Sequence, residues 1–448
     1  MQWKWPKGVD YRRFMVPMQG VLAAIPRPAE LAGPAVSTSL STVAQTEMYI
    51  QRLSETVDVA SSKAKPKTVY LTTVCGTTIK FLCKQEKNGD LRKDARMMEF
   101  NTAVNRLFQA DAEGRRRNLR LRTYAVVCLN EECGILEWVD NTAHLRHLIA
   151  EAHTYHSRDY PTVNTKEIFH PFTEAQVAHA DNLSELVKQY HALILDTYSP
   201  CFHRWFLGAF PDPTAWFDAR TAFTRSAAVW SAVGHVVGLG DRHTENVLID
   251  TTCGECVHVD FDCVFDKGLT LARPEIVPFR LTPNLVDAMG VTGVEGAYRR
   301  TMEACFTLLR DNKETLMAVL EPFLRDPTVA WGRGGRAQRA EHIATGSSTN
   351  NRGAATHLPE HTENADAKEA LEKISGRLIG VYNLINPSKY KILKGYSKRK
   401  EMQPRFGLGA AEDEALPLNV EGQVQRLIDE ARAEENLAQM YIGWQPWA

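Results

Sequence analysis

The first clear pattern of apolar and polar residues along the chain lies between Thr68 and Lys84. β-Branched and aromatic residues are concentrated there on both sides of Gly76, which predicts two strands joined by a turn. Before them, residues 1–62 mix aromatic residues and prolines with a Ser/Thr-rich patch. We expect this lead-in segment to contain a short helix near residues 45–60.

Helical and strand-like periodicities alternate in the next part of the chain. Residues 91–112 carry apolar side chains at roughly helical spacing, whereas residues 119–129 and 134–139 alternate between apolar and polar positions. Residues 63–140 are therefore predicted to form a small α+β unit of about five strands and one helix.

A mainly helical pattern follows, from residue 143 to residue 240. Within it, the apolar and small residues of 215–239 predict a central buried helix. Residues 247–263 indicate a strand, a turn and a second strand, and residues 294–325 are helical again. These segments predict a second, larger unit over residues 141–331.

The composition changes after the larger unit. Residues 332–365 are rich in Gly, Ser, Thr, Asn and His, with hardly any large apolar side chain, which is typical of a flexible linker. Helical patterns return near 366–384 and 419–438, so we predict a helical segment over 366–415 and a separate element over 416–448. The last helix should pack against an apolar surface, because one of its faces comprises Val420, Val424, Leu427, Ile428 and Ala431.

The whole chain has the composition of a folded globular protein. Its 448 residues are 44% hydrophobic and 24% charged, which suits about two or three folded units. The near balance of 53 basic and 54 acidic residues argues against a globally basic nucleic-acid-binding protein. We expect neither a transmembrane segment nor a signal peptide, because no uncharged apolar run approaches ~20 residues and the stretch Val21–Ile25 is too short.

The nine cysteines are too sparse for a disulfide framework and indicate reduced thiols. Cys253 and Cys256 form a CxxC pair near Cys263, but no second pair lies at zinc-finger spacing. We interpret these three residues as ordinary buried or edge thiols, with a structural zinc site as the minor alternative.

A basic run, Arg115–Arg117 followed by Arg120 and Arg122, raises the question of nucleic-acid binding. It lacks interleaved aromatic residues apart from Tyr124, and it lies between a predicted helix and a predicted strand. We interpret it as a solvated turn and predict no direct nucleic-acid binding.

The segment after the predicted central helix carries the chemistry. Phosphoryl transfer requires a carboxylate that accepts the hydroxyl proton, oxygen ligands for Mg²⁺, and positive charge on the phosphates. Asp241 is placed for the first role, and Asn246 and Asp260 can converge on one metal ion across the predicted hairpin. His243 can stabilise the charge that develops on the transferred group. Either carboxylate alone would more often be structural, but their order and spacing around Asn246 favour catalysis.

The motif Asp241-Arg-His-x-x-Asn246, followed by Asp260-Phe-Asp, is similar to the catalytic and metal-binding loops of the phosphatidylinositol 3-kinase-like superfamily. The strings 254–262 and 274–282 resemble its related-kinase (PIKK) branch, and residues 416–448 resemble the FATC element that ends members of that branch. The resemblance implies an α+β, bilobal kinase fold with a small β-rich N-lobe, a mainly helical C-lobe and C-terminal FATC helices. The helical segment before the FATC element is then expected to be regulatory.

The same resemblance assigns ATP binding to the smaller unit. Lys84 would hold the ATP phosphates, with Asp94 in the same polar cluster, and Gly76 would lie in the phosphate-covering loop. A cationic strand residue near a carboxylate suits that role. Trp138 would stack on adenine and the backbone of Val139 would hydrogen-bond to it, as suits a flat heterocycle in an apolar cleft. Trp138 as a plain core residue is the alternative.

By resemblance, residues 260–282 correspond to the activation segment of the family. The residues that match its motifs at either end are Asp260, Phe261, Asp262, Pro278, Phe279 and Arg280. Asp262 stands where the family usually has glycine or asparagine, so it adds a carboxylate near the metal. Inositol-lipid kinases need clustered cations in this segment for an anionic headgroup. This segment has only three cations, Lys267, Arg273 and Arg280, and they lie among acidic residues. This composition favours a peptide substrate.

The resemblance thus implies a serine/threonine protein kinase that uses ATP with Mg²⁺ or Mn²⁺. Its expected substrates are Ser/Thr-Gln sites in nuclear proteins of DNA-damage checkpoint signalling and repair. The regulatory subunit and activators expected for the full-length family bind to regions absent from this sequence, and no membrane partner is expected. A phosphoinositide lipid kinase and an inactive kinase-fold scaffold are the alternatives.

Overall fold

The computed structural model describes residues 14–18, 49–60, 65–85, 91–130, 132–156, 165–180, 182–271, 273–325, 365–381 and 417–448. The chain divides into two compact units. The first comprises Met1–Thr102 and Arg122–Asp140, and the second comprises Ala103–Leu121 and Asn141–Ala448. The predicted linker lies outside the described residues up to residue 364, as does the part of the predicted 366–415 segment beyond residue 381.

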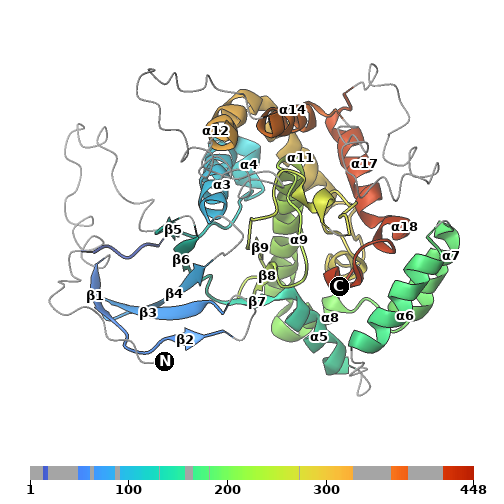
Figure 1. The fold of residues 1–448 in the computed structure, drawn as a ribbon, viewed down its shortest axis with the longest axis horizontal. Coiled ribbons are helices and arrows are strands. Elements are labelled where there is room, and N and C mark those ends of the chain that lie inside the picture. Colours follow the sequence, from blue (N-terminus) through green and yellow to red (C-terminus); the bar gives the residue numbers. More distant parts are fainter. Residues whose placement is uncertain are drawn as a thin grey trace, which may run out of the picture. The chain divides into compact units, whose positions relative to one another are not determined.

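The first unit is built on a six-stranded antiparallel sheet with the order β1-β3-β4-β6-β5, in which β2 pairs with β3 (Figure 1). The two strands predicted around Gly76 are confirmed as β3 and β4, which are joined by a turn. The strands are β1 (Ile50–Leu53), β2 (Asp58–Val59), β3 (Lys67–Thr73), β4 (Thr78–Gln85), β5 (Val126–Cys128) and β6 (Cys133–Glu137).

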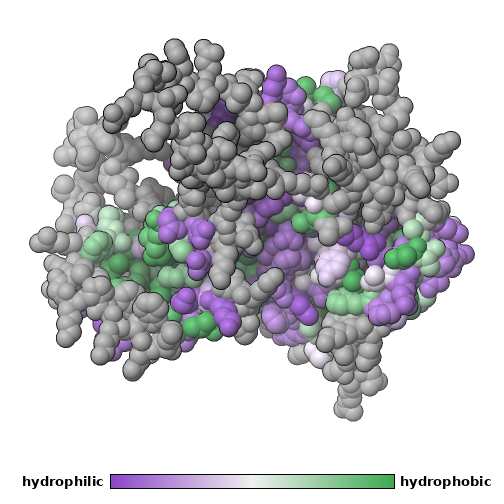
Figure 2. Space-filling view, viewed as in Figure 1, coloured by the Kyte–Doolittle hydropathy of each residue, from purple (hydrophilic) through white to green (hydrophobic). Residues whose placement is uncertain are grey.

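The short helix predicted near residues 45–60 is wrong, because β1 and β2 occupy that stretch. Ile50 of β1 is buried in a cluster with Val16, Leu71 and Phe81. Pairing with β3 and burial in this cluster outweigh the local helical pattern, and both depend on residues distant in sequence. Hydrophobic residues gather over the sheet in the space-filling view (Figure 2).

The predicted helix 91–112 becomes two helices, α3 (Arg92–Ala110) and α4 (Ala112–Arg116). Asp111 separates them, because its carboxylate accepts the backbone N–H groups of Glu113 and Gly114 at 2.7 and 3.0 Å and caps the second helix. The predicted strand 119–129 is shortened to β5. The side chain of Asn105 binds the N–H and C=O groups of Leu121, at 2.7 and 2.8 Å, in place of a strand partner.

Four arginines of the basic run, all except Arg122, have partners within the second unit. Arg115 donates to the carbonyl oxygens of residues 109 and 110, at 2.7 and 2.8 Å, and Arg116 and Arg117 pair with Glu113. Arg120 forms two hydrogen bonds with the buried carboxylate of Glu255, at 2.8 and 2.9 Å. These arginines therefore neutralise carboxylates and cover the end of α3.

The second unit is mainly helical, and its centre is the long helix α9. Asp212 caps α9 by accepting the N–H of Ala215 at 2.9 Å, and Pro213 occupies the first turn. Most residues of its second half are buried, which confirms the predicted central helix. The helices up to this point are α5 (Leu145–His156), α6 (Thr165–Ala178), α7 (Leu183–Tyr190) with its π-helical extension η3 (His191–Leu195), α8 (Phe202–Ala209) and α9 (Pro213–Val236).

The predicted hairpin is confirmed as β8 (Val247–Asp250) and β9 (Cys256–His258), which form a three-stranded sheet with β7 (Thr142–His144). Two polar contacts hold β9 on α9. The hydroxyl group of Ser226 accepts the backbone N–H of Cys256 at 2.8 Å, and the indole N–H of Trp230 donates to the carbonyl oxygen of Cys256 at 3.1 Å. The second strand ends at His258, so Asp260 lies just beyond it.

The remaining helices follow the predicted pattern except that residues 294–325 form two helices instead of one, with a break at Asn312. No helix in the described part of the chain is both long enough and apolar enough to cross a membrane. These elements are η4 (Lys267–Thr270), α10 (Pro283–Ala288), α11 (Ala297–Asp311), α12 (Lys313–Arg325), α14 (Ala365–Ile379), α17 (Val420–Arg432), α18 (Glu434–Leu437) and η6 (Ile442–Trp444).

A buried ion cluster joins α14 to the segment after β9. Asp266 lies 2.7 Å from Nη2 of Arg377 and 3.5 Å from Nζ of Lys373, and all three side chains are at most 10% exposed. Replacing Arg377 by alanine should destabilise the protein by about 3 kcal/mol, because Asp266 would keep only the more distant partner. The unfolding midpoint in urea measures this loss. The control is Lys368→Ala at an exposed position of α14, and equal midpoints for the two variants would contradict the prediction.

Candidate active site

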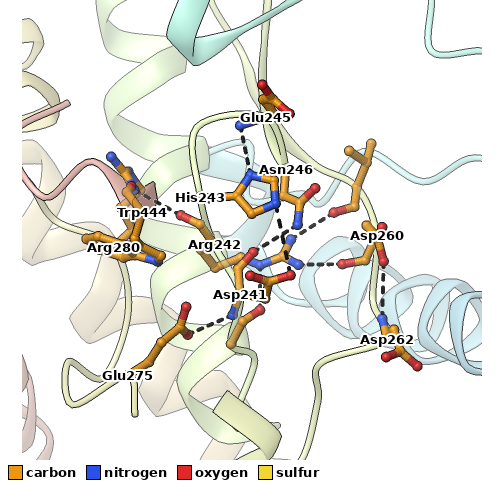
Figure 3. A network of polar contacts seen from close by, with 12 residues as sticks. Asp241, Arg242, His243, Glu245, Asn246, Asp260, Asp262, Glu275, Arg280 and Trp444 are labelled. Carbon is orange, nitrogen blue, oxygen red and sulfur yellow. Dashed lines mark hydrogen bonds and ion pairs between the residues drawn. The ribbon is translucent and has the colours of Figure 1, made fainter. Parts of the chain in front are cut away.

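Asp241 begins a loop that follows α9, and both of its backbone polar groups are held by side chains. Its N–H donates to Oε2 of Glu275 at 2.7 Å, and its carbonyl oxygen accepts Nδ2 of Asn246 at 2.9 Å (Figure 3). The backbone of Asp241 is left-handed, with φ of +57°, a conformation that is uncommon outside glycine although aspartate adopts it more often than most residues. The surrounding side chains therefore fix this residue in a strained orientation.

Arg242 ties this loop to the segment after β9. It is buried and donates to the carbonyl oxygens of Gly240 and Val259, each at 2.9 Å, and to that of Asp260. The N–H of Val259 donates to the carbonyl oxygen of Asn246 at 3.1 Å. These backbone links bring Asn246 and Asp260 into one site.

A backbone hydrogen bond within the loop orients the ring of His243. The N–H of Glu245 donates to Nδ1 at 3.2 Å, which leaves the ring proton on Nε2. That atom lies 4.0 Å from Oδ2 of Asp241 (Figure 3). Burial lowers the pKa of His243, although Asp241 opposes this effect. His243 can therefore donate a hydrogen bond from Nε2 near Asp241.

Burial raises the pKa of Asp241, while His243 and then Arg242 act in the opposite direction. An aspartate with a raised pKa is a better proton acceptor than an exposed one. A partly exposed carboxylate with a raised pKa is suited to general-base chemistry.

Asn246 and Asp260 have the donor types that suit Mg²⁺. The amide nitrogen of Asn246 is used by Asp241, so its amide oxygen is the atom left for a cation. The described residues contain no cluster of three or more His, Cys, Asp or Glu side chains that could hold a metal ion. Two side-chain oxygens nevertheless fit Mg²⁺, which is usually bound by one or two carboxylates together with substrate phosphates.

The residues after Asp260 divide between core and surface. Phe261 is fully buried, with its ring centroid 5.9 Å from that of Trp230. The carboxylate of Asp262 forms an ion pair with Lys267. The added acidic charge noted in the sequence is therefore neutralised within the segment.

Five predicted site residues belong to the first unit. Lys84 is half-buried on β4 opposite Gly134, and Asp94 is buried in the first turn of α3. Gly76 is exposed in the β3–β4 turn, with φ of +89°. Trp138, which precedes Val139, is 40% exposed, so the alternative of a plain core residue is wrong. The ammonium group of Lys80 lies 5.8 Å from its ring centroid.

The end of the activation segment is held by the last residues of the chain. Phe279 and Arg280 are buried and Pro278 is half-buried. Arg280 lies over the ring of Trp444, 4.2 Å from its centroid, and burial lowers its pKa to about 9, so it stays protonated at neutral pH. It donates to the carbonyl oxygens of Arg242, Trp444, Gln445 and Ala448. One cation therefore connects the Asp241 loop, its own segment and the C-terminal element.

The apolar face predicted for the last helix, α17, is buried against the rest of the second unit, apart from the half-buried Val420. Further contacts place the C-terminal element beside the activation segment. Thr244 donates to the side chain of Gln445, and Asn284 donates to the carbonyl oxygen of Trp447 at 2.9 Å. Packing of this element on the larger unit is thus confirmed.

Two residues of the site were not recognised from the sequence alone. Arg242 is visible inside the Asp-Arg-His motif, but a motif does not reveal that its guanidinium binds three carbonyl oxygens. Glu275 lies 34 residues beyond Asp241, and no local spacing connects the two.

Known proteins agree with this fold and these motifs. The family model described as phosphatidylinositol 3- and 4-kinase matches residues 78–333, and the FATC domain model matches residues 417–448. The chain therefore belongs to the phosphatidylinositol 3- and 4-kinase family. The predicted α+β kinase fold and the resemblance to the related-kinase branch, within it to the ATR checkpoint kinase, are confirmed by the relatives that follow.

The chain is 39% identical over 401 residues to the serine/threonine-protein kinase ATR of Arabidopsis thaliana, covering 89% of this chain and 12% of that protein. It is 39% identical over 400 residues to protein kinase rad3 of Schizosaccharomyces pombe, covering 89% of this chain and 14% of that protein. The solved structure of the FAT and kinase domain of CtTel1 superimposes with a TM-score of 0.69 at 29% identity, covering 93% of this chain and 25% of that chain. The sequence thus spans a small part of its curated relatives.

Proposed function

We propose that this chain is a serine/threonine protein kinase domain that transfers the γ-phosphate of ATP to a protein hydroxyl group. A protein substrate is favoured over a lipid because all three cations of the activation segment are bound within the chain. Lys267 pairs with Asp262, and Arg273 donates to the side chain of Gln176 and to the carbonyl oxygen of Gln439, at 2.5 and 2.7 Å. Arg280 binds backbone carbonyl oxygens. Each of these three cations already has a partner within the chain, which disfavours binding of the anionic headgroup that a lipid kinase must hold.

Asp241 is the proposed general base that accepts the proton of the substrate hydroxyl. The N–H at Nε2 of His243 supports the transferred group as negative charge develops on it. Asn246 and Asp260 would hold Mg²⁺ or Mn²⁺, which when bound neutralises charge on the ATP phosphates. Arg242 acts indirectly, because it fixes the backbone that carries Asp260.

The proposed nucleotide contacts come from the first unit. Lys84 would hold the ATP phosphates and Asp94 would belong to the same polar cluster, with Gly76 in the covering loop. Trp138 would stack on adenine, and the backbone of Val139 would bind its edge. The exposed ring of Trp138 supports its proposed role, because a stacking surface must be accessible to the ligand.

The biological assignment rests on the relatives named above. We infer that the substrates are nuclear proteins with Ser/Thr-Gln sites in DNA-damage checkpoint signalling and repair. A regulatory subunit and activators would act through regions outside this sequence.

Radiolabelled ATP with Mg²⁺ or Mn²⁺ tests the proposal. We expect incorporation into a Ser-Gln peptide, weaker incorporation into the matched Ser-Ala peptide, and none into phosphoinositide vesicles. Asp260→Asn should abolish the signal, because the site would lose its carboxylate metal ligand. Labelling of vesicles alone would favour the lipid kinase. Equal labelling by wild type and Asp260→Asn would contradict the assigned site, and no labelling by the wild type would favour the scaffold.

A further inference from the structure

We infer that Glu275 is a positioning residue that couples the activation segment to the catalytic base. Glu275 and Asn246 reach Asp241 from opposite sides in Figure 3. Glu275 accepts the N–H of Asp241 at 2.7 Å, while Asn246 donates to its carbonyl oxygen at 2.9 Å. This inference rests on the proposed kinase function, in which Asp241 is the base.

The carboxylate of Glu275 is held in a narrow slot between two glycines. A Cβ atom at Gly240 would lie 2.9 Å from Oε2, and one at Gly268 would lie 3.0 Å from it. A side chain at either position would therefore crowd the carboxylate and displace it from its present place. The slot is therefore shaped around Glu275.

Backbone hydrogen bonds fasten the same three stretches of chain. The N–H of Glu275 donates to the carbonyl oxygen of Gly268 at 3.1 Å, and the N–H of Gly240 donates to that of Cys263 at 2.8 Å. The position of Glu275 thus depends on the fold of residues 263–275. If this segment moved away, the N–H of Asp241 would lose its acceptor and the left-handed backbone would lose one of its two supports.

The chemistry at this position favours an acceptor rather than an ion pair. In the described part of the chain, the nearby cations are bound elsewhere, since Arg242 and Arg280 donate to backbone carbonyl oxygens. Burial raises the pKa of Glu275 to about 7, so the carboxyl group is readily protonated. A neutral acceptor of the same shape should therefore serve as well, whereas a methyl group cannot accept the hydrogen bond.

This requirement is tested with Glu275→Gln and Glu275→Ala in the full chain, with Glu303→Gln on α11 as the control. Loss of the acceptor in Glu275→Ala should lower kcat by roughly 10- to 100-fold, with the KM for ATP within about twofold of wild type. Glu275→Gln should restore most of kcat, and the control should match wild type. Unchanged kcat in Glu275→Ala, or no rescue by glutamine, would overturn the inference.

Hydrogen–deuterium exchange separates this result from a failure of the proposed function. The peptide covering residues 238–246 should exchange faster in Glu275→Ala than in wild type, and at the wild-type rate in Glu275→Gln. This readout does not require activity, so a wild type that labels no substrate defeats the kinase proposal alone. Equal exchange in all three proteins would defeat the coupling by Glu275.

Discussion

Replacing Asp241 by asparagine is expected to lower kcat by about 10²–10⁴-fold, the usual effect of losing a general base. The hydrogen bond from Asn246 goes to the backbone carbonyl of residue 241 and should survive the change. The KM for ATP should therefore change little. Steady-state kinetics with a Ser-Gln peptide measure both values, with the exposed Asp218→Asn as the matched control.

The pH dependence follows from the direction of the pKa shift. Asp241 must be ionised to accept a proton, and burial raises its pKa above the ordinary value, so activity should rise with pH through that raised value. A carboxyl group with a raised pKa favours folding most when protonated, and this contribution declines as the pH rises through the folded-state pKa. Asp241→Asn removes that decline, so its melting temperature at pH 7 should equal or exceed that of wild type. A lower melting temperature together with lost activity would indicate unfolding rather than loss of the base.

Replacing Trp447 by alanine should destabilise the protein by about 3–5 kcal/mol, the usual cost of removing a large buried aromatic side chain. The ring of Trp447 is buried and stacks on that of Tyr198, with 5.1 Å between their centroids. Its carbonyl oxygen accepts the side chain of Asn284. Since the neighbouring residues bind Arg280, peptide phosphorylation should also fall by at least about tenfold.

The control for this variant is Tyr441→Ala, because Tyr441 lies in the same element and is 58% exposed. Unfolding midpoints in urea and initial rates of peptide labelling are measured for both variants. Similar losses in both would mean that the whole element, rather than the buried contact of Trp447, is sensitive to substitution.

The proximity of the candidate site residues could be predicted because they lie within one short loop and one hairpin. Asp241, Asn246 and Asp260 are brought together by β8 and β9, and both strands have clear patterns of their own. The central helix α9 was equally visible, since its apolar residues outnumber its polar ones over many turns. The local pattern of apolar and polar residues was sufficient to predict an element wherever the contacting residues are also close in sequence.

Other features depend on distant partners and could not be predicted. β1 is a strand because of its pairing with β3 and the burial of Ile50. The contact between Asp266 and Arg377 spans 111 residues. Glu275 resembles any acidic loop residue until the fold places it against the N–H of Asp241. These contacts are set by tertiary packing, about which a local pattern carries no information.

The left-handed backbones of Asp241 and Asp260, with φ of +57° and +64°, set folding and catalysis against each other. Each such conformation costs roughly 1 kcal/mol or more for a residue that has a Cβ atom, and glycine would relieve that cost. Glycine, however, has neither a carboxylate to accept a proton nor one to bind a metal ion. If the two aspartates are the proposed base and metal ligand, the backbone at both positions favours the one residue that would abolish the proposed chemistry.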